Sequence, residues 1–265
     1  MKTFAMGWAG LLVALSVLSG CEAQVNRSRD NFGFLEIHKA AREGNTALVQ
    51  QLIERGAKVN IADLDGITPL HTAAKNNFIE LATVLLRNRA DPAMTTNDGW
   101  DALHLAAWKD HRDMVELLLS YGAFANRKTP MGWSAVHMAA FRGNLPILDI
   151  LNRDWASYAT AGKPSFNEPD KDGDAPLHLA IRNGHPSLVN FLVLRGADPN
   201  LKDAAGNSPL HLAIPQGDVE AVRVLVQQGA DVNARDKAGK TPYTITVEQQ
   251  NEAMARIIWE AGGTP

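Results

Sequence analysis

The 265-residue sequence has little of several features that mark common functional classes. Its single cysteine, Cys21, excludes an internal disulfide and any cysteine-rich zinc module. Basic residues number 26 and acidic residues 29, so the chain lacks the positive excess by which proteins hold a phosphate backbone. After Cys21 no segment approaches about 18 uninterrupted apolar residues, the length of a membrane-spanning helix. We therefore expect neither a nucleic-acid partner nor a transmembrane helix after Cys21.

Motifs that carry catalysis are missing too. The sequence contains no Gly-x-Ser-x-Gly elbow, His-Glu-x-x-His pair, Walker loop or paired cysteine spacing. We predict that the protein is not an enzyme and needs no cofactor, with a hydrolase site in the 153–169 stretch as an alternative. Calcium is a second alternative, at Asp63 with Asp65 or in the run Asp170 to Asp174. The latter run has Ile181 where an EF-hand has its twelfth-position glutamate, so we expect ordinary turns and no metal.

The composition that is present, 45% hydrophobic and 21% charged, is typical of a folded soluble protein. The N-terminus differs from the rest of the chain. Lys2 precedes an apolar stretch from Phe4 to Val17, and the run Leu18-Ser19-Gly20-Cys21 follows at once. This order of segments predicts a secretory signal peptide over residues 1–20. An uncleaved membrane helix that ends in a small buried cysteine is the alternative.

The run Leu18-Ser19-Gly20-Cys21 resembles the lipobox of bacterial lipoproteins. The resemblance implies cleavage before Cys21, attachment of lipid such as palmitate to its thiol, and a lipidated tether over residues 21–30. Since each buried methylene contributes roughly 0.8 kcal/mol, two or more acyl chains would anchor the protein stably to a membrane. Glu22, rather than Asp, follows the cysteine. In a diderm bacterium, the family's sorting pattern then implies the outer membrane, facing the periplasm.

Histidines reveal an internal repeat. His38, His71, His104 and His137 follow one another at intervals of 33 residues, as do His178 and His211. The interval from His137 to His178 is 41 residues, so about eight extra residues lie within 153–169. Thr244 stands where a seventh histidine would fall. A fixed period of this length is typical of stacked repeat architectures.

Each repeat carries the signals of two helices. Thr68 and Ser208 suit a helix N-cap, and the prolines that follow them suit the first helical position. Glycines such as Gly143 mark the end of the first helix, and Gly122 marks the end of a second, more apolar one. Asp-x-x-Gly segments predict the turn to the next repeat. The departures from the pattern include Asn77, Arg89 and Asp110 in glycine positions and Pro215 within a first helix.

The recurring run Thr68-Pro69-Leu70-His71 resembles the signature of the ankyrin repeat. The resemblance implies an all-α ankyrin-repeat solenoid over residues 31–263, with about seven helix-turn-helix units, hairpin loops and one interruption after the fourth unit. We place the units at approximately 31–63, 64–96, 97–129, 130–169, 170–203, 204–236 and 237–263. It also implies that the six repeated histidines are structural and bond the backbone between neighbouring units, in a ladder rather than around a metal ion.

Aromatic residues mark a candidate binding surface. Trp100 and Trp133 lie 33 residues apart, and so do Trp108 and Phe141, four residues beyond the repeated histidines. The places equivalent to Trp108 elsewhere hold Arg42, Lys75, Arg182 and Pro215, which indicates an exposed position. We expect the four aromatics on or near the concave side of the third and fourth units, in an interface. For each ring taken alone, packing under the adjacent hairpin is the alternative.

Loops supply further candidates, because loops on a rigid scaffold are frequent binding elements. They are Arg127, Lys128, Met131 and Lys171 at hairpin tips, and Trp155 and Tyr158 beside the extra residues. Together these features suggest a lipid-anchored envelope protein whose concave face binds one protein partner. A sharper hypothesis is an immunity protein that neutralises an antibacterial toxin such as a secreted phospholipase. An envelope or oxidative-stress scaffold without a single tight ligand is the alternative.

Overall fold

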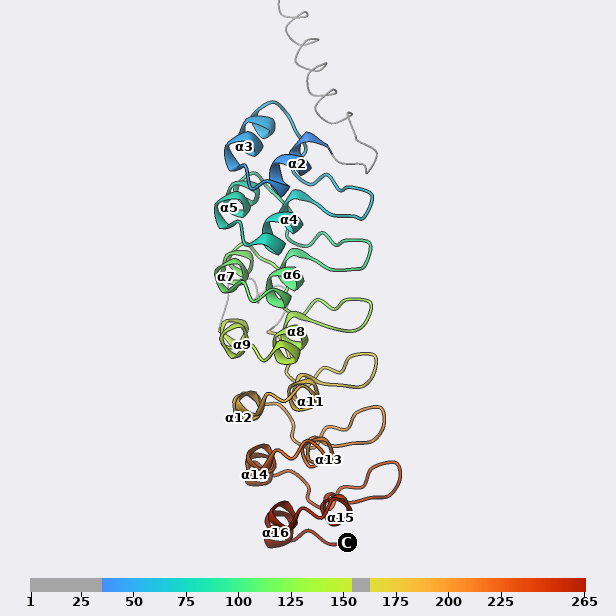
Figure 1. The fold of residues 1–265 in the computed structure, drawn as a ribbon. Coiled ribbons are helices and arrows are strands. Elements are labelled where there is room, and N and C mark those ends of the chain that lie inside the picture. Colours follow the sequence, from blue (N-terminus) through green and yellow to red (C-terminus); the bar gives the residue numbers. More distant parts are fainter. Residues whose placement is uncertain (1–34, 154–162) are drawn as a thin grey trace, which may run out of the picture. The chain divides into compact units, whose positions relative to one another are not determined.

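The computed structural model describes residues 35–153 and 163–265 (Figure 1). All regular elements in these two ranges are helices, so the predicted all-α class is confirmed. None of the described helices is long and apolar enough to cross a membrane. The expected signal peptide, Cys21 and the tether lie outside the described residues, and so do Trp155 and Tyr158.

The chain forms two compact units that divide between Ala106 and Ala107. The first unit contains α2 (Glu36–Arg42), α3 (Thr46–Glu54), α4 (Pro69–Asn76) and α5 (Ile79–Arg87), and α6 (Ala102–Trp108) crosses the division. The second unit contains α7 (Arg112–Ser120), α8 (Ala135–Arg142), α9 (Leu145–Asn152), α11 (Pro176–Arg182), α12 (Pro186–Leu194), α13 (Pro209–Ala213), α14 (Val219–Gln227), α15 (Pro242–Glu248) and α16 (Glu252–Glu260).

Helices within each unit are arranged as stacked pairs. In the first unit α4 packs on its partner α5 and on α2 of the preceding pair. In the second unit α11 packs on α12 within its pair, and on α8 and α13 of the adjacent pairs. A hairpin loop precedes each of the first helices α4, α8, α11, α13 and α15 (Figure 1). The predicted repetition of helix-turn-helix modules is therefore confirmed, and stability comes from the contacts between neighbours.

First helices begin as the sequence predicts. The Thr68 side chain accepts a hydrogen bond from the backbone N–H of His71 at 3.4 Å, and Pro69 occupies the first turn of α4. Capping satisfies one of the N–H groups that a helix start leaves without an intrahelical partner. Ser208 and Pro209 take the same places at the start of α13. The local sequence thus fixes where these helices start.

Residues that replace glycine adopt the left-handed backbone that glycine normally supplies. Asn77, Arg89 and Asp110 have φ angles of 58°, 66° and 63°. At Gly143, which is equivalent to Asn77 and Asp110 and has a φ of 75°, an added Cβ would lie 2.6 Å from the His185 ring, so glycine is required there. The turns at residues 77, 89 and 110 therefore keep their regular form, at the steric cost that a side chain incurs in this conformation.

Pro215 changes the local structure. Helix α13 covers only Pro209–Ala213, whereas α11 covers Pro176–Arg182. Proline has no N–H for the helical hydrogen bond, and its ring clashes with the preceding turn. The first helix of this repeat is consequently shorter than its neighbours.

The repeat pattern resumes directly after residue 162. Pro164 is buried, like Ala123 at the equivalent place in the preceding repeat. Asn167 donates to the Gly196 carbonyl at 2.8 Å and accepts from the Asp198 N–H at 2.7 Å. Asn200 makes the same pair of bonds one repeat later. The extra residues therefore precede Lys163, in the first part of the stretch where the sequence placed them.

Candidate protein-binding surface

The ring nitrogens of the repeated histidines bond groups within the fold. In His71, Nδ1 accepts from the Thr68 N–H at 3.0 Å, and Nε2 lies 2.9 Å from the Met94 carbonyl of the following hairpin. His137 repeats this arrangement with Ser134 N and the Glu168 carbonyl. The Nε2 atoms of His38, His178 and His211 approach the carbonyls of Ile61, Leu201 and Lys240. For His104 the described contact is at Nδ1, which accepts from the Asp101 N–H at 3.2 Å.

Burial keeps several of these rings neutral. Desolvation lowers the pKa of His71 and His178 and lowers that of His137 to about 4. Only the neutral imidazole offers one acceptor and one donor, which matches the backbone N–H on one side and the carbonyl on the other. The protonation state and the hydrogen-bond pattern therefore support each other.

The aspartates that raised the calcium alternative form turns. Asp170 Oδ1 accepts from the N–H groups of Asp172 and Asp174, both at 2.9 Å. Asp63 Oδ1 accepts in the same way from Asp65 and Ile67. No group of three or more His, Cys, Asp or Glu side chains within 35–153 and 163–265 is arranged to hold a metal ion. In both places the carboxylate stabilises its own hairpin turn.

Three of the four expected aromatics meet in the second unit, where they form the aromatic cluster: Trp108, Trp133 and Phe141. The rings of Trp108 and Phe141 stack, with centroids 5.5 Å apart and planes 24° apart. Trp133 lies 6.2 Å from Trp108 and 5.1 Å from Phe141, tilted to both. Trp100 belongs to the first unit, where its ring meets the edge of His104 at 6.3 Å.

The aromatic cluster is held in place but remains accessible. All three rings are half-buried. Trp133 Nε1 donates to Asp170 Oδ2 at 2.8 Å, which ties that ring to the next hairpin and gives it a structural role. The guanidinium of Arg142, itself exposed, lies 5.6 Å from the Trp108 ring centroid. A cation over an indole face is favourable, so Arg142 helps to fix the Trp108 ring.

The hairpin-tip candidates divide into two kinds. Met131 is 56% exposed, and the exposed Lys171 donates its backbone N–H to the Met131 carbonyl at 3.1 Å, so the two tips are adjacent. Lys128 instead bonds Glu168 at 2.9 Å and the carbonyl of the following proline. Arg127 places its guanidinium 5.4 Å from the neighbouring Phe124 ring. Met131 and Lys171 are therefore exposed neighbours at adjacent hairpin tips.

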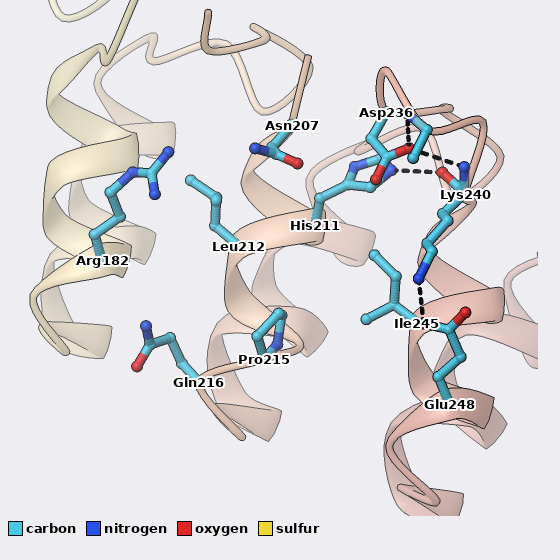
Figure 2. A pocket seen from close by; sticks show the side chains of 11 residues that line it. Arg182, Asn207, His211, Leu212, Pro215, Gln216, Asp236, Lys240, Ile245 and Glu248 are labelled. Carbon is cyan, nitrogen blue, oxygen red and sulfur yellow. Dashed lines mark hydrogen bonds and ion pairs between the residues drawn. The ribbon is translucent and has the colours of Figure 1, made fainter. Parts of the chain in front are cut away.

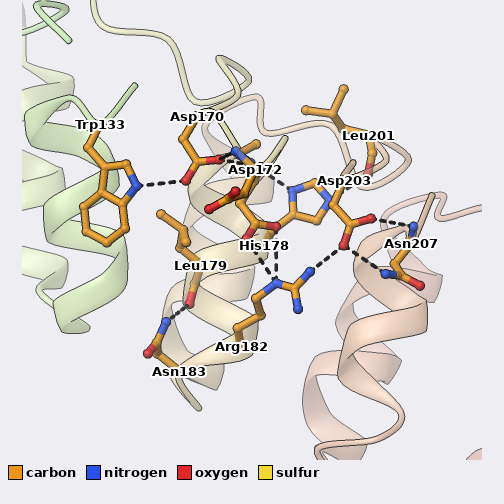
Figure 3. A network of polar contacts seen from close by, with 12 residues as sticks. Trp133, Asp170, Asp172, His178, Leu179, Arg182, Asn183, Leu201, Asp203 and Asn207 are labelled. Atoms are coloured by element: carbon orange, nitrogen blue, oxygen red, sulfur yellow. Dashed lines mark hydrogen bonds and ion pairs between the residues drawn. The ribbon is translucent and has the colours of Figure 1, made fainter. Parts of the chain in front are cut away.

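Sequence reasoning did not foresee a polar network beside the aromatic cluster (Figure 3). Arg182, on α11, bonds Asp174 at 3.2 Å and also bonds Asp203 of the next hairpin. Burial raises the pKa of Asp174 in spite of Arg182. Burial acts to raise the pKa of Asp203 as well, but hydrogen bonds from Asn207 and the charge of Arg182 together lower it. The guanidinium of Arg182 is thus bonded both to Asp174, whose pKa is raised, and to Asp203, whose pKa is lowered.

A pocket of about 520 Å³ was also not foreseen (Figure 2). It lies among α11, α13 and α15, and its apolar lining comes from Leu212, Pro215, Ala238 and Ile245. Arg182 stands on one side, and Lys240 with its ion-pair partner Glu248 stands on the other. The one sequence signal for this pocket was the irregular Pro215. Its lining comes from three repeats, so it becomes visible only when they are stacked.

Comparisons with known proteins agree with this architecture. A family model of ankyrin repeats in three copies matches residues 37–129, 123–203 and 177–264. The ankyrin repeat domain of Bcl-3, a member of the IkappaB family, is similar at 25% identity and a TM-score of 0.76, covering 86% of this chain and all of its own. That of human ASB11 is also 25% identical, with a TM-score of 0.70 and coverage of 88% and 100%.

A bacterial structure is similar as well. An ankyrin repeat domain from Acinetobacter baumannii AYE is 25% identical, with a TM-score of 0.68, and the match covers 74% of this chain and 98% of that one. No curated protein matches the sequence. Ankyrin repeats commonly mediate protein–protein binding, and domains of this kind are generally non-enzymatic. Since the family model spans most of the chain, this protein belongs to the ankyrin-repeat family.

Proposed function

We propose that the protein binds one protein partner through the aromatic cluster while lipid on Cys21 holds it at the bacterial cell envelope. The aromatic cluster is the observation that carries the choice of surface. Partly buried aromatic rings gathered at one place are where binding energy concentrates in protein interfaces. Trp108 and Phe141 occupy a repeat position that holds Arg182 and Pro215 in the next two repeats, so the stack does not require rings there.

The aromatic cluster suits binding because its shape is set before the partner arrives. The rings contact one another, Asp170 holds Trp133, and Arg142 covers part of Trp108. A preordered surface loses little conformational entropy on association. Its residues also come from stacked helices and a tied hairpin, which move less than an isolated loop. Replacing two of the three rings should therefore remove a large part of the binding free energy.

The test is affinity capture from the native envelope with wild-type protein and with the double variant Trp108→Ala/Phe141→Ala, followed by quantitative mass spectrometry. An interface hot spot contributes about 2 kcal/mol or more, which is about 30-fold in affinity, so we expect the double variant to bind at least that much more weakly even if only one of its two rings is a hot spot. Tyr121→Ala is the matched control, because Tyr121 is an exposed aromatic at the end of α7. Equal capture by the double variant and the wild type would show that another surface binds.

Folding must be checked separately. Circular dichroism and thermal unfolding of the double variant distinguish loss of the surface from loss of the stack. A variant that retains the wild-type helical signal but loses the partner supports the proposal. If the double variant unfolds, Phe141→Arg serves instead, because an arginine stands at the equivalent place in the next repeat, at position 182.

In this proposal the protein faces the periplasm from the outer membrane, and its partner is an antibacterial toxin such as a secreted phospholipase. The lipobox-like run that ends at Cys21 supports the location, and a non-enzymatic binding domain with a rigid surface is suited to stoichiometric inhibition. Cells that lack the protein should die in competition with toxin-producing siblings, and the wild-type gene should restore survival. Normal survival would contradict immunity while leaving protein binding intact.

A further inference from the structure

Two successive repeats carry a positive charge directly after an aromatic ring. Lys109 follows Trp108 on the chain. One repeat later, Arg142 follows Phe141 at the equivalent place. The other repeats have no cation there, and their equivalent residues are Glu43, Asn76, Asn183, Gln216 and Gln249. The stacked fold therefore does not require a positive charge at this position, and the two cations occur only where the aromatic cluster lies.

The two cations are exposed and have no acidic partner among the described residues. The side chain of Lys109 makes no hydrogen bond or ion pair within the described part of the chain. The guanidinium of Arg142 lies 5.6 Å from the centroid of the Trp108 ring, and it likewise forms no ion pair with a described residue. Most other cations of the second unit bond a carboxylate or a carbonyl, as Lys128 and Lys240 do. The N–H donors of Lys109 and Arg142 are therefore available to another molecule.

The carboxylates of the polar network beside the aromatic cluster already have donors. Both oxygens of Asp170 accept hydrogen bonds, Oδ1 from its own turn and Oδ2 from Trp133. Asp174 and Asp203 both bond the guanidinium of Arg182 (Figure 3). A cation of a partner would have to displace these contacts. An anion of a partner instead meets the available donors of the two cations that follow the rings.

Two further carboxylates lie near the aromatic cluster, and each is accompanied by a cation. Asp110 lies 3.7 Å from the guanidinium nitrogen of Arg112. Asp172 is exposed at a hairpin tip, where the exposed Lys171 is its chain neighbour. The two cations that follow the rings are therefore the positive groups of this surface that have no carboxylate of their own.

A carboxylate is the group that these donors fit. The planar guanidinium of Arg142 offers parallel N–H groups that a carboxylate can accept in pairs, and Lys109 adds a second positive charge. Because Arg142 is held over the Trp108 ring, its donors lie beside the apolar surface of the aromatic cluster. Residues two apart on an extended strand, or three to four apart on a helix, have side chains about 5–7 Å apart. One segment can therefore place a carboxylate on Arg142 and an apolar side chain on the rings.

We infer that the partner proposed above presents an acidic segment to this surface. An apolar side chain of that segment packs on the aromatic cluster, and an Asp or Glu within four residues of it bonds Arg142. A further acidic residue of the segment lies near Lys109. This inference rests on the proposed function and adds the chemistry of the partner, which is an apolar anchor flanked by carboxylates. Such charge complementarity speeds association and disfavours basic partners.

The probe is a phage-displayed library of random 12-residue peptides, selected on the purified full-length protein in neutral detergent. Enriched peptides are resynthesised with a fluorescent label, and their affinities are measured by anisotropy at several salt concentrations. The charge variant Lys109→Gln/Arg142→Gln removes both charges and introduces the glutamine found at two equivalent places of the stack. Arg195→Glu is the matched control, because it changes the net charge equally at another exposed arginine, which lies 5.2 Å from the centroid of the Phe191 ring on α12.

We expect enriched peptides to carry at least two acidic residues, with an apolar residue within four positions of one of them. They should bind at least about tenfold more weakly to the charge variant, because their carboxylates lose charged donors. Their affinity for Arg195→Glu should be unchanged. Added salt should weaken binding to the wild type and have much less effect on the charge variant, since screening acts on the charges that this variant lacks.

The acidic segment and the proposed function fail in different ways. Enriched peptides that need Trp108 and Phe141 but bind the charge variant as they bind the wild type would overturn the acidic segment and leave the proposed function standing. Neutral or basic peptides that need the two rings, or an equal salt dependence of wild type and charge variant, would do the same. Peptides insensitive both to the charge variant and to Trp108→Ala/Phe141→Ala would overturn both. A selection without any enrichment would overturn the acidic segment, because a short peptide suffices to present it, and the capture experiment then decides the proposed function.

Discussion

His137 provides a sharp prediction about stability and pH. Its ring is buried, with Nδ1 accepting from the Ser134 N–H and Nε2 facing the Glu168 carbonyl of the next repeat. Protonation of Nδ1 would remove this acceptor and place a ring N–H against the N–H of Ser134. We consider His137→Gln. Its side chain is polar but cannot place an acceptor at the Nδ1 position and a donor at the Nε2 position at the same time. The variant should lose the link between the two repeats and the acid sensitivity that the link brings.

The magnitude follows from the pKa of His137, which desolvation lowers from 6.5 to about 4 in the folded protein. Between these two pH values the unfolded chain binds more protons than the folded one, so the folded state loses stability as the pH falls through this window. Integration from pH 7 to pH 5 gives a loss of about 2 kcal/mol from this residue. His71 and His178, whose pKa values are also lowered, add losses of the same sign in both proteins.

The assay is urea unfolding of wild type and His137→Gln at pH 7 and pH 5, followed by circular dichroism. At pH 7 the variant should be less stable by about 2 kcal/mol, because it loses buried hydrogen bonds. At pH 5 the difference should nearly vanish, since the wild type has lost a similar amount through His137. A difference that stays constant between pH 7 and pH 5 would refute the neutral buried ring. Titration of the His137 ring by NMR would then show a pKa near 6.5 instead of about 4.

Three further predictions concern other parts of the chain. Arg89→Gly should raise the free energy of unfolding, measured by urea titration, by about 0.5 kcal/mol. Glycine removes the steric strain of the left-handed backbone, and this gain outweighs the entropy that glycine adds to the unfolded chain. Arg89→Ala should bring no such gain, because alanine keeps the Cβ that causes the strain. Asp170→Ala should lower the free energy of unfolding by about 2–3 kcal/mol, because the N–H groups of Asp172, Asp174 and Trp133 lose their acceptor. The tryptophan emission of this variant should also shift to longer wavelength, and an unchanged spectrum would contradict the hydrogen bond of Trp133. Cys21→Ser should abolish labelling by a palmitate analogue and release the protein from the membrane fraction, whereas a labelled variant would place the lipid elsewhere.

The fold could be predicted from the sequence because its determinants are local and repeated. The 33-residue spacing of His38, His71 and His104 fixed the period, and caps such as Thr68 fixed the helix starts. Deviations were harder to interpret. Arg89 adopts a left-handed backbone because the turn at its position requires one, although arginine itself disfavours this conformation. Pro215 shortens α13. Its missing N–H predicts that the helix is disturbed, but it does not predict at which residue the helix ends.

The surface was predicted in part. Equal spacing brought Trp108 and Phe141 together, because equivalent positions of stacked repeats are neighbours. The contact of Arg142 with Trp108 depends on side-chain rotamers, which spacing does not determine. The pocket needs side chains from three repeats, and Arg182 joins hairpins that are far apart in sequence. These features depend on the packed structure, so they could not be read from local patterns.

A site-specific photo-crosslinker tests most directly whether the aromatic cluster touches a protein. Benzoylphenylalanine is placed at Phe141 or, as a control, at Tyr121, and the cells that make the protein are irradiated. Binding by the aromatic cluster predicts a covalent adduct of one defined mass from position 141 and none from position 121. An adduct from position 121 together with none from position 141 would contradict it.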